Sequence, residues 1–553
     1  SFYENYAGRF ADGKFIRGNF NFVAPGTDPD VMMRITPAGA TNLVDPTTVK
    51  IGDPFGYVGD SATSGWAGPI RKPHTDDEIK SLRFSAKRAL EGIFSSLDFG
   101  VNYSQRDKTV KKNQFDTRMK KDGAGVFINT VPSAYLRAPV DLSGYGVPPV
   151  ISIDAEGLAN SGFFNSAQAT WLTVTSDSSV HEKITTGFVK LDIDTEVAGF
   201  GVRGNVGTQA VHTSQNATGW SWLGGADRDT VTNLRAISGG KNFNDFLPSL
   251  NLVVDLNNDT FLRFGAARTL VRPEINDLRA GANAELKAKD AACVPTIATP
   301  CAATWTTSTA GNPELEPWRA NSLDLSIEKY IGKQTYVAAA VYRKTLLNNI
   351  FVSAIQRDFS NVPHDPKLQP TSNLVTVTAP ANGEGGYVEG LELSGAIEGK
   401  ILSPMLDGFG IVASASKVRS SLHAGNDENL PLEGLSGYTT SLTVFYEKSG
   451  FSARVNKTHR SPFLAQTRNW DYTTNYTKTG AENLVNLQFG YSVDTGMMKG
   501  LSLTLLVNNV TDAALVTQKS IGAQGFNPDP DALVPYEVRK FGRQIGLGVG
   551  FKF

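Results

Sequence analysis

The clearest pattern of apolar and polar positions lies at the end of the chain, where residues 541–553 read FGRQIGLGVGFKF. Apolar side chains occupy every second position there: Ile545, Leu547, Val549, Phe551 and Phe553. A period of two predicts a β-strand, because successive side chains of a strand point to opposite sides of the sheet. The other face carries glycine and few charges, which suits a strand with lipid on one side and a crowded interior on the other.

The same alternation recurs along the chain in pairs of segments joined by short turns. The predicted hairpins are 80–89 with 93–104, 183–192 with 196–211, 249–256 with 260–269, 322–330 with 335–344, 387–397 with 408–420, 438–447 with 451–458, and 484–493 with 501–510. A weaker first strand is predicted at residues 15–22, and the terminal strand ends the series. The pattern therefore predicts about 16 strands.

The connections between these segments alternate in length. Within a hairpin the turn has a few residues, whereas successive hairpins are separated by roughly 12 to 75 residues, which is unusual in a compact soluble domain. Transmembrane β-barrels have short periplasmic turns and longer extracellular loops. The sequence therefore predicts an all-β fold, a transmembrane antiparallel up-and-down β-barrel with long extracellular loops, whose last strand runs toward the periplasm.

Composition excludes several other classes of protein. The 553 residues include 19% charged and 40% hydrophobic residues, and the formal net charge is −1. This balance is neither basic enough to indicate nucleic-acid binding nor polar enough to indicate disorder. Apolar runs stay well below the roughly 18 residues of a membrane-spanning helix, which argues against a helical membrane protein but not against a barrel.

Two cysteines, Cys293 and Cys301, lie close together in a stretch rich in alanine, threonine and proline. In an oxidising compartment this spacing predicts a disulfide that closes a small loop. Two free thiols are the alternative. A metal site is disfavoured because no histidine or second cysteine pair lies at a ligand spacing.

Several stretches resemble the barrel of TonB-dependent outer-membrane receptors, in particular the large-loop branch associated with complex carbohydrates. The similar stretches are FLPSLN at 246–251, LRFGAARTLVRP at 262–273, GNPELEP at 311–317, VEGLEL at 388–393, VNNVTD at 507–512 and the terminal GRQIGLGVGFKF. They follow the order found in that family and cover residues 80–553. The resemblance implies a barrel of about 22 strands around a plug that engages TonB.

Neither a plug nor the first barrel strands is visible in the sequence. We therefore expect residues 1–553 to form a partial barrel, either as a fragment or as one piece that a partner chain completes. A complete channel of about 16 strands is the alternative. Open sheet edges argue against it, since unpaired backbone groups in lipid are costly.

All seven tryptophans lie in or beside predicted connections, where aromatic faces could stack on sugar rings. The candidate ligand-binding residues are Trp66, Trp220, Trp222, Trp305 and Trp470. The alternative is that such side chains pack loops together or lie in an interfacial aromatic belt, which is the interpretation favoured for Trp318.

Other candidate sites are weaker. Residues 106–121 hold seven basic and two acidic residues in a predicted outer loop, which could bind lipopolysaccharide phosphates or be a solvated loop. Asp427, Glu428 and the acidic pair at 529–531 could hold calcium. Residues 199–204 match a dinucleotide fingerprint, but no helix pattern follows them. The sequence predicts no catalytic constellation, no metal site and no cofactor, and hence no enzyme.

The predicted function is energised uptake of a scarce, bulky solute across the outer membrane of a Gram-negative bacterium. The resemblance implies an oligosaccharide as first substrate, with a ferric siderophore as the alternative. A passive diffusion channel and a surface adhesin are alternatives from other classes. The expected partners are outer-membrane lipid, lipopolysaccharide and, through a plug, the TonB complex, but not nucleic acid.

Overall fold

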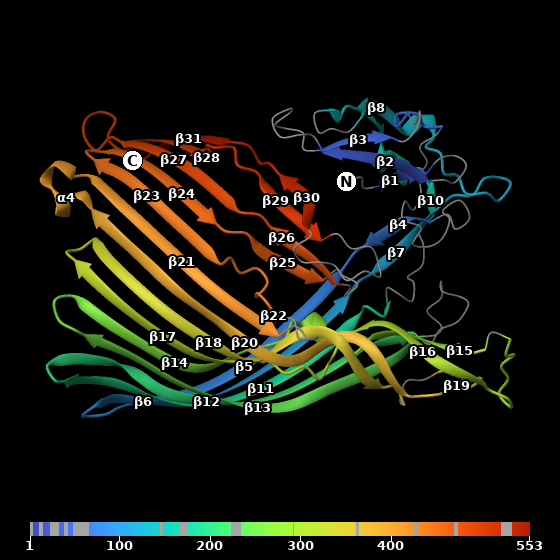
Figure 1. Cartoon of the computed structure of the whole chain (residues 1–553), viewed down its shortest axis with the longest axis horizontal. Coiled ribbons are helices and arrows are strands. Elements are labelled where there is room, and N and C mark those ends of the chain that lie inside the picture. Colours follow the sequence, from blue (N-terminus) through green and yellow to red (C-terminus); the bar gives the residue numbers. More distant parts are fainter. Residues whose placement is uncertain are drawn as a thin grey trace.

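Figure 1 shows the computed structural model of the chain, which is dominated by one large, curved antiparallel sheet. The structure describes residues 4–9, 15–22, 33–37, 42–47, 66–143, 148–165, 174–222, 234–290, 292–360, 364–423, 429–468, 474–520 and 533–552. No helix in these residues is long and apolar enough to cross a membrane.

Each strand of the large sheet pairs antiparallel with the next in an up-and-down order. The strands are β5 (His74–Ala89), β6 (Phe94–Lys111), β11 (Ser178–Val197), β12 (Phe200–Trp222), β13 (Leu234–Asp255), β14 (Thr260–Val271), β17 (Trp318–Ile331), β18 (Thr335–Asp358), β20 (Leu374–Glu398), β21 (Phe409–His423), β23 (Tyr438–Lys448), β24 (Phe451–Arg460), β27 (Glu482–Ser492), β28 (Leu501–Asn508) and β31 (Gln544–Phe551). The seven predicted hairpins and the terminal strand are confirmed.

The predicted first strand has a different place. Residues 15–22 form β2 (Phe15–Phe22), which pairs with β1 (Glu4–Arg9) and β3 (Met33–Pro37) in a separate small sheet. The alternation was therefore read correctly as a strand, but its assignment to the barrel was wrong. Three further small sheets are described. One consists of β4 (Trp66–Arg71), β7 (Gln114–Met119) and β10 (Phe164–Asn165), and the second of β8 (Leu136–Val140) and β9 (Val150–Ile153). The third consists of β25 (Phe463–Arg468), β26 (Thr474–Thr479), β29 (Leu515–Ser520) and β30 (Leu533–Arg539).

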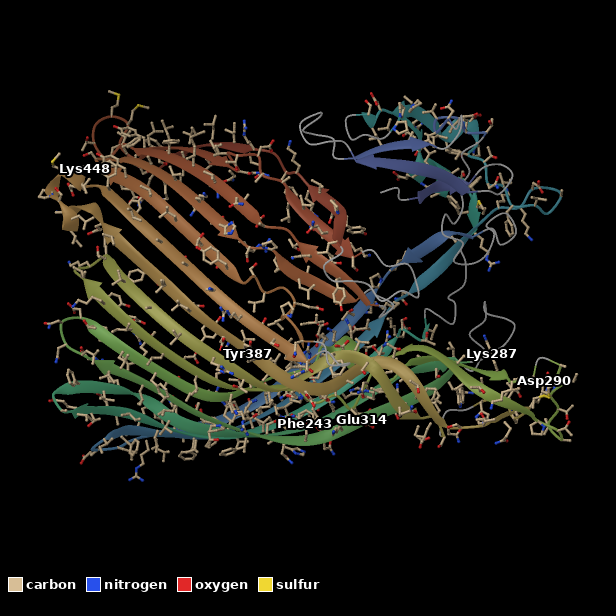
Figure 2. All side chains as sticks on the ribbon, viewed as in Figure 1. Phe243, Lys287, Asp290, Glu314, Tyr387 and Lys448 are labelled. Carbon is tan, nitrogen blue, oxygen red and sulfur yellow. A yellow bond between two sulfur atoms is a disulfide. The ribbon has the colours of Figure 1, made fainter. Side chains whose placement is uncertain are left out.

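Several strands are longer than the alternating pattern predicts, and five of them have at least 20 residues. Strands β11, β12, β13, β18 and β20 have 20, 23, 22, 24 and 25 residues. A barrel strand crosses a membrane with about 9–11 residues. The remainder extends the sheet beyond the long-connection end, where we had expected irregular loops. Figure 2 shows this extension: Lys448 lies at the turn end, and Lys287 and Asp290 lie at the opposite extremity.

The two faces of the sheet differ as the alternation predicts. On β17, Leu323, Leu325 and Ile327 are 56%, 44% and 47% exposed on one face. On the opposite face, Glu328 binds Arg263 of the neighbouring β14 at 2.8 Å. We therefore assign the apolar face to lipid and the polar face to the lumen.

Tight turns close the short ends. Ala198 and Gly199 join β11 to β12 with φ angles of 52° and 84°, which both lie in the left-handed region. Two-residue hairpin turns of type I′ require this geometry, and glycine adopts it without strain. The glycines at 199–204 thus belong to a hairpin, as expected, and not to a nucleotide site.

Candidate functional site

Two connections fold back across the lumen-facing side of β11–β13 at the outer mouth of the barrel. They are residues 272–281, between β14 and β15 (Ala282–Ala288), and residues 311–317, between β16 (Cys301–Ala310) and β17. We call them the lining segments. The Gln215 amide on β12 donates hydrogen bonds to the carbonyl oxygens of Pro313 and Leu315, at 2.9 and 2.7 Å.

An apolar cluster holds the lining segments against the wall. Leu278 and Leu315 are almost completely buried, with 1% and 0% exposure, against Val180 of β11 and Ala217 of β12. Gly239 of β13 lies beside Pro313, where a Cβ atom would come within 2.6 Å of the proline ring. Burial of side chains this size contributes roughly 1.5–3 kcal/mol each relative to exposure. The mouth is therefore built as a packed structure.

Ion pairs fix the entry of the chain into β17. Glu316 binds Lys241 of β13 at 2.6 Å and Arg319 at 2.7 Å, and Arg319 also contacts Asp245 of β13, which is only 7% exposed. These two cations hold the pKa of the Glu316 carboxyl below its ordinary value, with Lys241 the larger influence. Removal of one partner would leave a buried charge unpaired.

Arg272 lines a cavity in the wall together with Arg268, several polar side chains and the apolar Val211, Leu247, Ala267 and Leu270. Its guanidinium donates to the Thr213 hydroxyl at 3.2 Å, and burial lowers the pKa of this arginine while Glu182 and Asp245 oppose that shift. The cavity measures about 410 Å³, and its lumen-side lining includes Thr186, Gln209, Ser249, Thr269 and Arg272. Hydroxyl and amide groups of this kind can exchange hydrogen bonds with an uncharged polar solute.

One carboxyl in the lining segments is strongly perturbed. Asp277 lies in the short helix η3 (Ile275–Leu278), and its backbone oxygen accepts a hydrogen bond from Asn312 at 2.7 Å. Burial, and then the nearby Glu274, raise the pKa of Asp277 to about 6, against the influence of Arg279. The first lining segment therefore holds a buried carboxyl whose pKa lies well above its ordinary value.

Two of the five predicted ligand-binding tryptophans, Trp220 and Trp305, have described side chains. Trp220 is 39% exposed near the end of β12, whereas Trp305 on β16 is 7% exposed and packs edge-on against Phe359, with ring centroids 5.3 Å apart. Trp66 begins β4 and Trp222 ends β12. Trp470 lies outside the described residues. Trp305 therefore packs an outer connection, which was the alternative to ligand binding.

The disulfide is present, and the basic stretch is not a loop. Cys293 and Cys301 are joined, with Cα atoms 6.1 Å apart. Most of residues 106–121 belong to β6 and β7, so the loop prediction was wrong. Arg106 binds Asp77 of β5 at 2.7 Å. Its charge is thus used within the sheet, because the pairing of β6 with β5 and β11 continues as far as Lys111 and Val110.

The proposed calcium ligands at 427–428 and 529–531 lie outside the described residues. Within the described part of the chain, no cluster of three or more histidine, cysteine, aspartate or glutamate side chains could hold a metal ion.

Sequence reasoning missed the residues that build the mouth. Gln215 and Asp245 lie in strands that the pattern did not extend far enough, and a buried polar residue gives no signal of its own. The GNPELEP stretch at 311–317 contributes to the sequence analysis only as a similarity, although its two prolines, Pro313 and Pro317, disfavour a regular strand or helix there. That composition was the available signal for a packed connection.

A family model described as TonB dependent receptor-like, beta-barrel matches residues 2–510. No curated protein sequence matches the chain.

Among solved structures, the ferric citrate transporter FecA has 13% identity and a TM-score of 0.48, over 88% of this chain and 57% of that one. The ferric yersiniabactin uptake receptor FyuA from Yersinia pestis has 11% identity and a TM-score of 0.46, over 88% of this chain and 55% of that one. The siderophore receptor PiuA from Acinetobacter baumannii has 12% identity and a TM-score of 0.47, over 89% of this chain and 58% of that one. The chain thus spans less than two thirds of the length of each.

Proposed function

Because this chain belongs to the TonB-dependent receptor β-barrel family, whose model matches residues 2–510, we propose that it forms the barrel wall of a receptor for energised uptake of a bulky solute. Proteins of this family lie in the outer membrane and are transporters, not enzymes. The outer mouth then captures the solute, and a plug displaced through TonB opens the path inward.

The charge balance of the mouth carries our proposal for the solute. Three cationic side chains and three carboxylates lie together on the described lumen side of the outer wall: Lys241, Arg272, Arg319, Glu182, Asp245 and Glu316. Four of them, Lys241, Arg319, Asp245 and Glu316, form ion pairs with one another, so their charge is used within the wall. The cavity in the wall adds the hydroxyl and amide groups of Thr186, Gln209, Ser249 and Thr269 beside Arg268 and Arg272. These groups favour a polar solute rich in hydroxyl groups, and an oligosaccharide fits that description.

Growth of a deletion strain tests this choice. Loss of the receptor should abolish growth on particular oligosaccharides and leave growth under iron limitation unchanged. The purified receptor should bind those oligosaccharides and bind ferric siderophores at least tenfold more weakly. Tight binding of a ferric chelate together with no binding of oligosaccharides would overturn the carbohydrate assignment and support the siderophore alternative.

We also propose that further strands, and a plug, complete this barrel. The described pairings give β5 the single neighbour β6 and β31 the single neighbour β28. All eight residues of β31 are exposed, and those of β5 are exposed with one exception. Unpaired strand edges cost several kcal/mol per backbone group in lipid. A receptor from native membranes that contains these 553 residues alone and conducts ions in a planar bilayer would contradict this proposal.

A further inference from the structure

The lipid-facing surface carries a group of cationic side chains at the upper limit of its apolar band. They are Arg343 on β18, Lys417 and Arg419 on β21, and Lys457 on β24, and all four are exposed. We call them the outer cation patch. Side chains two positions apart on a strand share a face, so Arg343 lies on the same side as Val341, and Lys457 on the same side as Val455. These two valines are 47% and 45% exposed to lipid.

Strand register makes the patch continuous. Glu389 of β20 lies opposite Arg343 on one side and opposite Arg419 on the other. Lys417 lies opposite Tyr438 of β23. The Tyr438 ring is 5.8 Å from the ring of His459, which is two residues from Lys457 on the same face of β24.

Most of this positive charge is not neutralised by the protein. Arg343 binds Glu389 at 3.1 Å and lies 5.2 Å from the Tyr387 ring. In the described part of the chain, Lys417, Arg419 and Lys457 have no carboxylate at ion-pair distance. Three uncompensated cations beside a low-dielectric layer attract an anion strongly.

The height of the patch matches the membrane boundary. At the turn end, Phe409 and Tyr446 form an aromatic pair on the lipid-facing side, with ring centroids 4.7 Å apart. Phe409 and Arg419 are ten positions apart on β21. A rise of about 3.3 Å per residue and a strand tilt of about 40° place Arg419 about 25 Å above Phe409, which is the height of the apolar band of such barrels. The patch therefore lies at the long-connection boundary, which faces the outer leaflet.

A groove lies directly below the patch on the same face. It measures about 580 Å³, and its lining includes Ile327, Ala339, Leu393, Gly395, Ala413 and Ala415. Ala339, Leu393 and Ala415 are registered side by side across β18, β20 and β21. Ala415 is two residues below Lys417, so the groove ends next to the cations. Small side chains between larger apolar ones leave space that a hydrocarbon chain can fill.

We propose that this face binds one phosphorylated, acylated lipid of the outer leaflet. Its phosphates contact Lys417, Arg419 and Arg343, and one acyl chain occupies the groove. Charge-assisted hydrogen bonds from arginine and lysine hold the phosphates, while Glu389 keeps Arg343 in place. The site lies outside the barrel and is separate from the solute path through the mouth.

The test uses the whole receptor in mild detergent and the bisphosphorylated lipid anchor of lipopolysaccharide, with native mass spectrometry as readout. The double variant Lys417→Gln/Arg419→Gln should bind this lipid about tenfold more weakly than the unaltered receptor. Enzymatically dephosphorylated lipid should bind weakly to both. A matched control, Arg203→Gln/Lys344→Gln, removes two exposed cations from the lumen-facing side of β12 and β18 and should bind the lipid normally.

A second variant tests the groove separately. Ala415→Leu fills the depression but keeps all four cations, and it should weaken binding of the fully acylated lipid several-fold. Heat-dependent gel mobility verifies that each variant is folded. Unchanged binding by the double variant, equal binding of the dephosphorylated lipid or equal loss in the control would each overturn the proposal. If the lipid still binds to a receptor that combines the double variant with Ala415→Leu, it is held at another site, and the proposal is overturned.

Discussion

Single buried polar side chains decide how the outer mouth is held. Gln215 is 4% exposed and donates to two carbonyl groups that belong to no strand. Without these bonds the Pro313 and Leu315 carbonyls would be buried unsatisfied, because the surrounding cluster excludes water. The same reasoning applies to Asp245, whose cation partner Arg319 comes from a strand two positions away in the sheet.

We predict that Gln215→Leu loosens the second lining segment. The change removes both hydrogen bonds and should lower the free energy of local opening of residues 311–317 by about 1–3 kcal/mol. Amide hydrogen exchange in this segment should accelerate by about fivefold or more. The control Asn216→Leu alters the neighbouring, exposed residue of β12 and should leave this exchange unchanged.

A pH dependence is predicted for Asp277. Its pKa in the folded protein is about 6, above the ordinary 3.8, so the folded state binds a proton more tightly than the open state. The closed arrangement of the first lining segment should therefore be more stable at pH 5 than at pH 7. This gain in stability should be complete below about pH 4, where both states are protonated, and should be lost as the pH rises through about 6.

Hydrogen exchange of residues 274–281, corrected for intrinsic rates, measures this effect. Exchange should be slower at pH 5 than at pH 7 in the unaltered protein. Asp277→Asn should exchange slowly at both values, since the amide cannot ionise. If the variant keeps the same pH dependence, another group is responsible.

At the scale of single strands, the alternation of side chains assigns each residue to lipid or lumen. The assignment predicts opposite outcomes for adjacent positions on β17. Leu325→Lys places a charge near the centre of the lipid-facing side and should destabilise the folded barrel by about 2–4 kcal/mol, whereas Ser326→Lys faces the lumen and should cost little. Urea titration of the barrel in vesicles measures both. Equal destabilisation would mean that the face assignment of β17 is incorrect.

The strand scale is also where the sequence is most informative. Lipid on one side enforces apolar residues at alternate positions, so every hairpin within the membrane band could be predicted. Beyond the band, no lipid enforces apolar residues at alternate positions of β12 or β20, which explains why the pattern predicts loops for their outer halves. Strand β2 shows a second limit of the method. Alternation identifies β2 as a strand but does not show which sheet the strand joins.

The candidate site was predicted less well for a related reason. Tryptophans are conspicuous in a sequence, yet Trp305 is used for packing within the outer extension. Gln215, Asp245 and Arg319 are common residue types whose importance arises only when distant segments meet. The outer cation patch likewise depends on register between strands, which the periodicity of a single strand does not contain.

At the scale of the whole molecule, the two ends of the barrel differ in the length of their connections and in the side chains that they carry. One end has the short turns, and the other has the extended strands (Figure 1). The aromatic pair of Phe409 and Tyr446 lies at the turn end, whereas the lining segments and the outer cation patch lie toward the extended strands. Short turns face the periplasm and long connections face the exterior in bacterial barrels. This fixes the direction of the terminal strand β31, which enters from the outside and ends at the periplasmic side.

A matched pair of exposed lysines tests this orientation. Lys367 lies in the outer connection that precedes β19 (Leu368–Pro370), and Lys333 lies in the turn between β17 and β18. In intact cells a membrane-impermeant maleimide should label Lys367→Cys, whereas Lys333→Cys should react only after the outer membrane is permeabilised. The native Cys293 and Cys301 form a disulfide and should give no background. Labelling of Lys333→Cys in intact cells would show that the barrel has the opposite orientation in the membrane. The proposed capture of solute at the mouth and the proposed binding of lipid in the outer leaflet would then both be wrong.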